Sequence, residues 1–266
     1  MLCALAITAW CWPSVWASGA VRAGAGDRSG AGTNIGLDLL GQARHFLSYA
    51  AELTGSGDED TLAFTATSAS FAIYCWRSSQ TATSPTPSLA SFSSMSGTWR
   101  CSYCLVGSRD AQLAAIAARA LKEVRYHQRF SRGWLERLGN GTALSAQRMQ
   151  SAVDNLWRFT GELFQADELE IELSAQGIAV DPRELQAEWQ NAVHTALIDA
   201  GLQIPQEAAF RSGGKQGLHS EHLGPLLAEM QYLQRAYPGT SSGSRRGLCN
   251  VWLISRPRRS TPSGIC

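Results

Sequence analysis

Apolar side chains recur every three to four residues through two blocks of the chain, residues 34–65 and 108–239. This spacing places them on one face of an α-helix, and neither block keeps the strict alternation that a half-buried strand would show. Gly55 is placed to end the first helix. Asp110 is placed to begin the second and Gly139-Asn140-Gly141 to end it, and Ser145 is placed to begin the third. The pattern predicts an all-α bundle of long helices.

The rest of the chain, residues 1–33, 66–107 and 240–266, has a different composition. These three pieces are rich in Ser, Gly, Thr and Trp, and they hold all seven cysteines but only one acidic residue, Asp27, of 22. We expect a helical domain over 34–239 that is interrupted by an irregular insert at 66–107. An anomalous N-terminal segment, 1–33, precedes the domain, and a disordered tail, 240–266, follows it.

The N-terminal stretch MLCALAITAWCWPSVWASGA (1–20) imitates a secretion signal. No Lys or Arg precedes Arg22, however, and Pro13 and three tryptophans interrupt the apolar run. The run is also shorter than the roughly 20 apolar residues that a bilayer span needs. We expect a cytoplasmic protein that does not bind membranes. The net charge of +1 likewise gives no reason to expect a nucleic acid as partner.

Cys101-Ser-Tyr-Cys104 has the spacing of a redox dithiol or of half a zinc site. A structural zinc site needs a second pair of ligands, and a redox motif needs a βαβ context in which the cysteines open a helix. The flanking sequence provides neither, so no function is assigned to this pair.

A carboxylate-bridged di-iron site in a helical bundle requires Glu-x-x-His on two helices. None of the five histidines has Glu three positions before it; those positions hold Gln42, Val124, Asn191, Gln216 and His219. No catalytic residue, cofactor site or metal ligand is therefore predicted. Glu123 and His127 are four residues apart beside the apolar stripe, and we expect them to form a buried polar pair.

Two groups of residues are candidates for contacts with a partner protein or with the phosphates of a nucleotide-like ligand. The first is a basic row at helical spacing, Lys122, Arg125, Arg129 and Arg132. Such a row is more often a solvated helix face. The second is a glycine-rich segment before a helix start, where free backbone N–H groups favour anions. Its candidate residues are Gly213, Gly214, Lys215, His219, Glu221 and His222.

The ordered blocks also resemble a known family. The residues that carry the likeness are NIGLDLLGQARHFLSYAAEL (34–53), GDEDTLAF (57–64), ALKEVRYHQRFSRGWLERLGNGT (120–142), LWRFTGELF (156–164), GIAVDPREL (177–185) and GGKQGLHSEHLGPLLAEMQYLQR (213–235). They are similar to the C subunits of bacterial 1,2-phenylacetyl-CoA epoxidases, also called phenylacetate-CoA oxygenases. The likeness fails in the three anomalous pieces.

The resemblance implies a ferritin-like helical bundle that acts as a structural subunit without metal ligands. It would bind and support a related catalytic subunit that carries a di-iron centre, together with the other subunits of a multicomponent monooxygenase. That complex converts phenylacetyl-CoA to its ring 1,2-epoxide in aerobic phenylacetate catabolism. The candidate contacts above would then meet the partner subunit or coenzyme A.

Two other classes stay open from the residues alone. One is a stand-alone ferritin-like metal-binding oxidoreductase, and the other is a secreted helical protein with cysteines.

The anomalous pieces are compatible with translation in a shifted reading frame. The nucleotides of Ser94–Arg100 can be reread as DVWHLA, and those of residues 66–76 as DERQLRNLLL, both of which are helical and charged strings. Residues 25–33 can likewise become LEIAQALA, which runs directly into NIGLDLL. We hypothesise that the three pieces are products of a wrong frame. Losing the native helices there would cost burial comparable to the stability of a domain.

Overall fold

The computed structural model describes residues 26–55, 57–66, 96–98, 100–206, 212–219 and 223–237. Within these residues the secondary structure is helical and contains no strand, which confirms the predicted all-α class. The α-helices are α2 (Gly26–Thr54), α3 (Glu59–Thr65), α5 (Ala111–Gly139), α6 (Ala143–Trp157), α7 (Glu168–Ala175), α8 (Gln186–Asp199) and α9 (Leu223–Ala236). Short 3-10 turns lie at η3 (Thr160–Phe164), η4 (Pro182–Leu185) and η5 (Gly214–Gln216).

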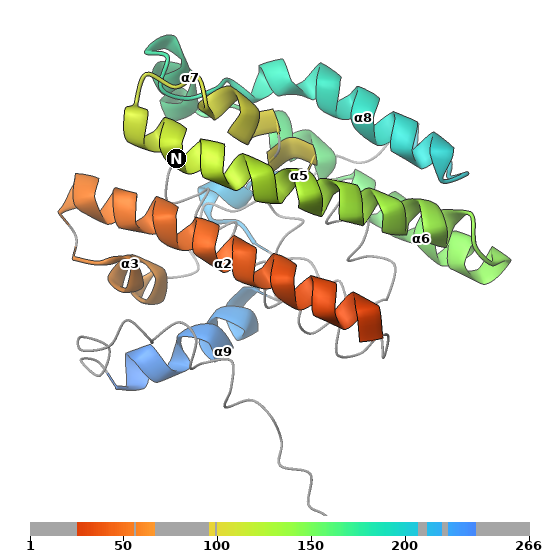
Figure 1. Ribbon diagram of the computed structural model, residues 1–266, viewed down its shortest axis with the longest axis horizontal. Helices are drawn as coiled ribbons and strands as arrows, with labels where there is room; N and C mark the ends of the chain where they lie inside the picture. Colours follow the sequence, from red (N-terminus) through yellow and green to blue (C-terminus); the bar gives the residue numbers. More distant parts are fainter. Residues whose placement is uncertain are drawn as a thin grey trace, which may run out of the picture.

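The two longest of these helices, α2 and α5, lie side by side and run in opposite directions (Figure 1). Tyr49, near the end of α2, donates a hydrogen bond to Asp110, which caps the start of α5. Asp110 in turn accepts from the backbone N–H groups of Gln112 and Leu113, so one carboxylate both starts α5 and fixes it to α2.

The apolar stripes of these two helices meet in the first of two core clusters. Its buried members include Ile35, Leu39, Ala43, Phe46, Leu47, Leu113, Ala117, Val124, Leu223 and Leu227. A second cluster joins the far end of α5 to α6 and α8 through Leu135, Met149, Val153, Trp189, Val193, Ala196 and Leu197. Gly139 permits this packing, because a Cβ there would collide with the carbonyl oxygen of Ala200 on α8's C-terminal side.

Side chains of α9 donate hydrogen bonds to carbonyl groups at the C-terminal end of α3. The last carbonyl groups of a helix have no partner within the helix. Here Gln231 donates to the carbonyls of Ala63 and Ala66, and Arg235 donates to those of Phe64 and Ala66. These bonds join residues that are 165 or more positions apart in sequence, and they fix α9 to α3.

Several expected boundaries differ from the observed ones. The first helix begins at Gly26, eight residues inside the segment expected to be anomalous, because adding residues to an existing helix is far easier than nucleating one. The helix expected to start at Ser145 starts at Ala143, where Thr142 is the cap and accepts from the N–H of Ser145. Asp181 caps the 3-10 turn η4, and α8 follows that turn directly.

The prediction that residues 66–107 are irregular is wrong for the end of that range. Residues 96–98 and 100–105 are helical. Leu105 is 2% exposed within the first core cluster, and Cys101, one turn earlier, packs against the same cluster. Cys101 and Leu105, four residues apart, therefore lie on one side of this helical stretch and pack against the core. The remainder of the three anomalous pieces, except residues 26–33, 66, 106 and 107, lies outside the described residues.

Among the described helices, none has the length and apolar content needed to cross a bilayer.

Candidate functional site

Polar side chains cross the contact between α2 and α5 at two levels. His127 Nε2 of α5 lies 2.9 Å from Asp38 Oδ2 of α2, and Gln42 Nε2 of α2 donates to Glu123 Oε2 of α5 over 2.8 Å. The expected hydrogen bond between Glu123 and His127 is therefore wrong. Each residue pairs with α2 because side chains one turn apart on α5 both face that helix.

His127 is fully buried, as expected, with 0% of its surface exposed. Burial lowers the pKa of His127 below its usual value, although Asp38 and Glu123 act in the opposite direction. The neutral imidazole then donates from Nε2 to the Asp38 carboxylate. Nδ1 has no hydrogen-bond partner, and neither does the buried hydroxyl of Ser131 one turn further along α5.

A groove of about 180 Å³ opens on the outer side of this contact. Its lining residues are Leu37, Asp38, Gly41, Gln42, His45, Ile116, Arg119, Ala120 and Glu123. Burial and the nearby Arg119 guanidinium lower the pKa of His45, so this imidazole is uncharged at neutral pH. The lining of the groove therefore carries two carboxylates, Asp38 and Glu123, and one guanidinium, Arg119.

The glycine-rich segment does bind an anion, but the anion is a side chain of the protein itself. Glu162 is 1% exposed, and its Oε1 accepts from the N–H groups of Gly213 over 3.1 Å and Gly214 over 2.6 Å. Gly213 has φ +119°, which a residue with a side chain rarely adopts. The glycine allows two successive N–H groups to converge on one carboxylate oxygen.

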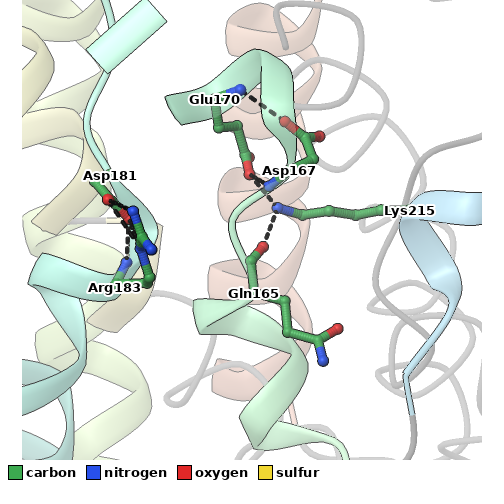
Figure 2. Close-up of polar contacts among 6 residues, drawn as sticks. All are labelled: Gln165, Asp167, Glu170, Asp181, Arg183 and Lys215. Atoms are coloured by element: carbon green, nitrogen blue, oxygen red, sulfur yellow. Dashed lines mark hydrogen bonds and ion pairs between the residues drawn. The ribbon is translucent and has the colours of Figure 1, made fainter. Parts of the chain in front are cut away.

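The next residue, Lys215, is held by a second set of contacts (Figure 2). Its Nζ donates to the carbonyl of Gln165 over 2.8 Å and to Glu170 Oε2 over 2.6 Å. Glu170 also accepts from the N–H of Asp167, so the same carboxylate completes the capping box of α7. Both side chains of the ion pair are largely buried, at 17% and 15% exposure.

These contacts change the interpretation of the predicted anion site. The donors of Gly213, Gly214 and Lys215 are already used inside the protein, so they are not open to a coenzyme A phosphate. His219 is half-buried, and Glu221 and His222 lie outside the described residues. The expected ligand contact at this segment is thus replaced by a structural role, since the segment fastens the approach to α9 onto η3 and α7.

The four residues of the basic row on α5 differ in whether they form ion pairs within the protein. Lys122, Arg125 and Arg129 are exposed and make no ion pair within the described residues. Arg132 is committed to the fold, since it binds Glu136 over 2.7 Å and Asp199 of α8 over 2.6 Å. Three cations of the predicted row therefore remain available to an external partner.

The Cys101–Cys104 pair lies on one short helical turn, with Cys101 half-buried and Cys104 exposed. Burial raises the pKa of the Cys101 thiol to about 12, and burial also raises that of Cys104. A metal ligand or redox nucleophile needs the thiolate, which these surroundings disfavour. Across the part of the chain that the structure describes, no group of three or more His, Cys, Asp or Glu side chains is arranged to hold a metal ion.

The sequence left several of these residues unassigned. Asp38 and Gln42 stand four apart on α2, so both could have been placed on one polar strip beside the apolar stripe. No local pattern marks the bonds of Glu162 to the glycines or the ion pair of Glu170 with Lys215, because those partners are at least 45 residues away in sequence.

Comparison with known proteins agrees with these helical blocks. Residues 27–241 match the family model described as phenylacetic acid catabolic protein. The chain is also similar to the C subunit of the 1,2-phenylacetyl-CoA epoxidase of Escherichia coli (strain K12), with 58% identity over 211 residues. That match covers 77% of this chain and 83% of the relative.

Proposed function

The chain belongs to the phenylacetic acid catabolic protein family, and from this premise we propose that it is the C subunit of a 1,2-phenylacetyl-CoA epoxidase. The observation that carries the proposal is the 58% identity to the C subunit of the Escherichia coli enzyme over 211 residues. The proposed setting is the aerobic catabolism of phenylacetate in the cytoplasm.

Within that enzyme, we assign this chain a supporting role and assign the chemistry to a related di-iron subunit. Several features favour this division. The sequence lacks the Glu-x-x-His pairs that a di-iron bundle needs. The polar side chains at the centre of the bundle are engaged with each other, since His127 is paired with Asp38 and Glu123 with Gln42.

A bundle without metal contributes to catalysis through its surfaces. Burying helix faces against a catalytic subunit restricts the positions of that subunit's helices, and the ligands on those helices then keep a fixed geometry. The exposed cations Lys122, Arg125 and Arg129 are the proposed contacts for an acidic surface of the complex or for coenzyme A phosphates.

Co-expression with a di-iron epoxidase subunit tests the proposal. We expect the two chains to purify together in a fixed ratio, with iron accompanying the catalytic subunit and not this chain purified alone. Lys122→Glu and Arg125→Glu together should weaken the complex at low salt. Glu229→Gln on α9, an exposed carboxylate, serves as the control substitution.

Two results would contradict the proposal. If this chain alone bound iron stoichiometrically, a stand-alone metal enzyme would be the better assignment. If the folded chain failed to bind any catalytic subunit of its family, the assignment to the epoxidase would be wrong.

A further inference from the structure

One side of α5 carries a row of exposed cations. The four members of this row are Arg119, Lys122, Arg125 and Arg129. They recur three and four residues apart, so they lie along one side of the helix, over about 15 Å of its axis. All four are exposed, and within the described residues none of them forms an ion pair. We call this side the outer face of α5.

Other helices occupy the remaining sides of α5. In Figure 1, α2 lies below α5 and α8 lies above it, and both helices contact it. α6 packs near the end of α5 around the buried Leu135. The next cation, Arg132, is turned toward α8, where it binds Asp199. The outer face is thus the side that the described helices leave to a partner.

An ordered aromatic side chain stands among these cations. Tyr126 is 46% exposed, four residues from Lys122 and three from Arg129. Its ring stacks on Phe130 with the ring centroids 6.3 Å apart, and Phe130 meets the Trp134 ring edge to face over 6.3 Å. Protein interfaces are enriched in tyrosine and arginine, and a ring already held by its neighbours loses little freedom on binding.

The shape of this surface favours a protein partner over a small phosphate ligand. A small ligand is held where donors converge in a concave site, whereas side chains on the convex side of a helix spread apart. The groove beside α2 includes Arg119 but none of the other three cations. An acidic helix matches the row better, because its carboxylates can repeat at the same three- and four-residue spacing. An apolar residue between those carboxylates can cover Tyr126.

We propose that the outer face of α5 docks an acidic helix of the di-iron subunit, with Tyr126 as the apolar contact among the four cations. This inference rests on the proposed function, because it takes the partner from the same enzyme. It goes further in naming carboxylates of a protein helix, and not the phosphates of coenzyme A, as the anions that meet the row. Such a contact associates more slowly as salt is added, since its charges are screened.

Lys122 provides a direct test by cross-linking. The sequence contains two lysines, Lys122 and Lys215, and Lys215 is held by Glu170 inside the protein. A carbodiimide joins an amine to a carboxylate without a spacer, so it reports groups in direct contact. In the complex with the di-iron subunit, we expect Lys122 to be joined to an Asp or Glu of that subunit. Mass spectrometry should place this residue on a helix that carries a second carboxylate three or four positions away.

Binding measurements on single variants separate charge from apolar contact. Arg129→Glu should raise the Kd for the di-iron subunit at least about tenfold at about 50 mM salt, and less at about 500 mM. Tyr126→Ala should raise it about fivefold at both salt concentrations, because an apolar contact is not screened. Arg148→Glu is the matched control, since Arg148 is exposed on α6 and undergoes the same change of charge. Far-ultraviolet circular dichroism checks that every variant stays helical.

The outcomes distinguish this inference from the proposed function. A complex that forms without a cross-link at Lys122, or that Arg129→Glu and Arg148→Glu weaken equally, would overturn the inference and leave the proposed function standing. Displacement of the subunit by coenzyme A at about 1 mM would assign the row to phosphates and would overturn the inference as well. A parent chain that forms no complex with the subunit would overturn both.

Discussion

Replacing Glu162 with Ala tests whether the buried carboxylate holds the glycine-rich segment in place. The substitution removes the acceptor of two backbone N–H groups, those of Gly213 and Gly214, in a place where the carboxylate is 1% exposed. A buried donor left without a partner costs about 1–3 kcal/mol. Two such donors predict a loss of about 4 kcal/mol in the free energy of unfolding.

This loss is large compared with the total stability of a typical domain, about 5–15 kcal/mol. It corresponds to a fall of roughly 8–16 °C in Tm for a domain of this size. Glu162→Gln keeps an oxygen acceptor without its charge and should lose less than half as much. Glu229→Ala, an exposed carboxylate on α9, should change stability by less than about 0.5 kcal/mol.

Urea unfolding followed by circular dichroism gives the three free energies. Amide hydrogen exchange provides a local measurement, in which Gly213 and Gly214 should exchange slowly in the parent and much faster in Glu162→Ala. An Ala variant within about 1 kcal/mol of the parent, with both amides still protected, would refute the reasoning.

Three solution measurements and one at the DNA level follow. A thiol reagent at neutral pH should label Cys104 before Cys101, because burial raises the pKa of Cys101 to about 12; equal rates in the folded chain would count against the described packing. Because the pKa of His127 is lowered in the fold, the stabilisation that the buried neutral imidazole gives is complete above about pH 6.5, the ordinary pKa of a histidine. That stabilisation falls as the pH drops toward the lower pKa of the folded state. Urea midpoints measured downward from about pH 7.5 should decline less in His127→Gln. The hydrogen bond to Asp110 raises the pKa of Tyr49 to about 12, so its stabilisation should be lost between about pH 10 and 12, a loss that Tyr49→Phe should not show. Resequencing the coding DNA across codons 1–35 and 64–110 should reveal single-base insertions or deletions that restore DVWHLA and LEIAQALA; an unchanged sequence would reject the frame hypothesis.

The helices could be predicted from the sequence because their signals are local. The apolar spacing along α2 and α5, the cap at Asp110 and the break at Gly139 each depend on a few neighbouring residues. Where two nearby residues could both cap a helix, the observed start differs from the predicted one, since Thr142 rather than Ser145 caps α6. Residues 96–98 and 100–105, a stretch that contains Ser and Cys, are nevertheless helical, and Leu105 of this stretch is buried in the core.

The polar contacts are less predictable, since they depend on how distant segments meet. The burial of His127 follows from its place on the apolar stripe, but its partner Asp38 is 89 residues away. The glycines at 213 and 214 indicate a segment that attracts an anion. That Glu162 is this anion depends on the path of the chain through η3, which no spacing rule describes.

The most direct test of the proposed role is a reconstituted epoxidation assay. The catalytic di-iron subunit, the remaining subunits and the reductase would be supplied with phenylacetyl-CoA, with and without this chain. The proposed role predicts ring epoxide only when this chain is present, and the same iron content in the catalytic subunit in both mixtures. Full activity in its absence, or activity from this chain with reductase alone, would contradict the assignment of a supporting subunit.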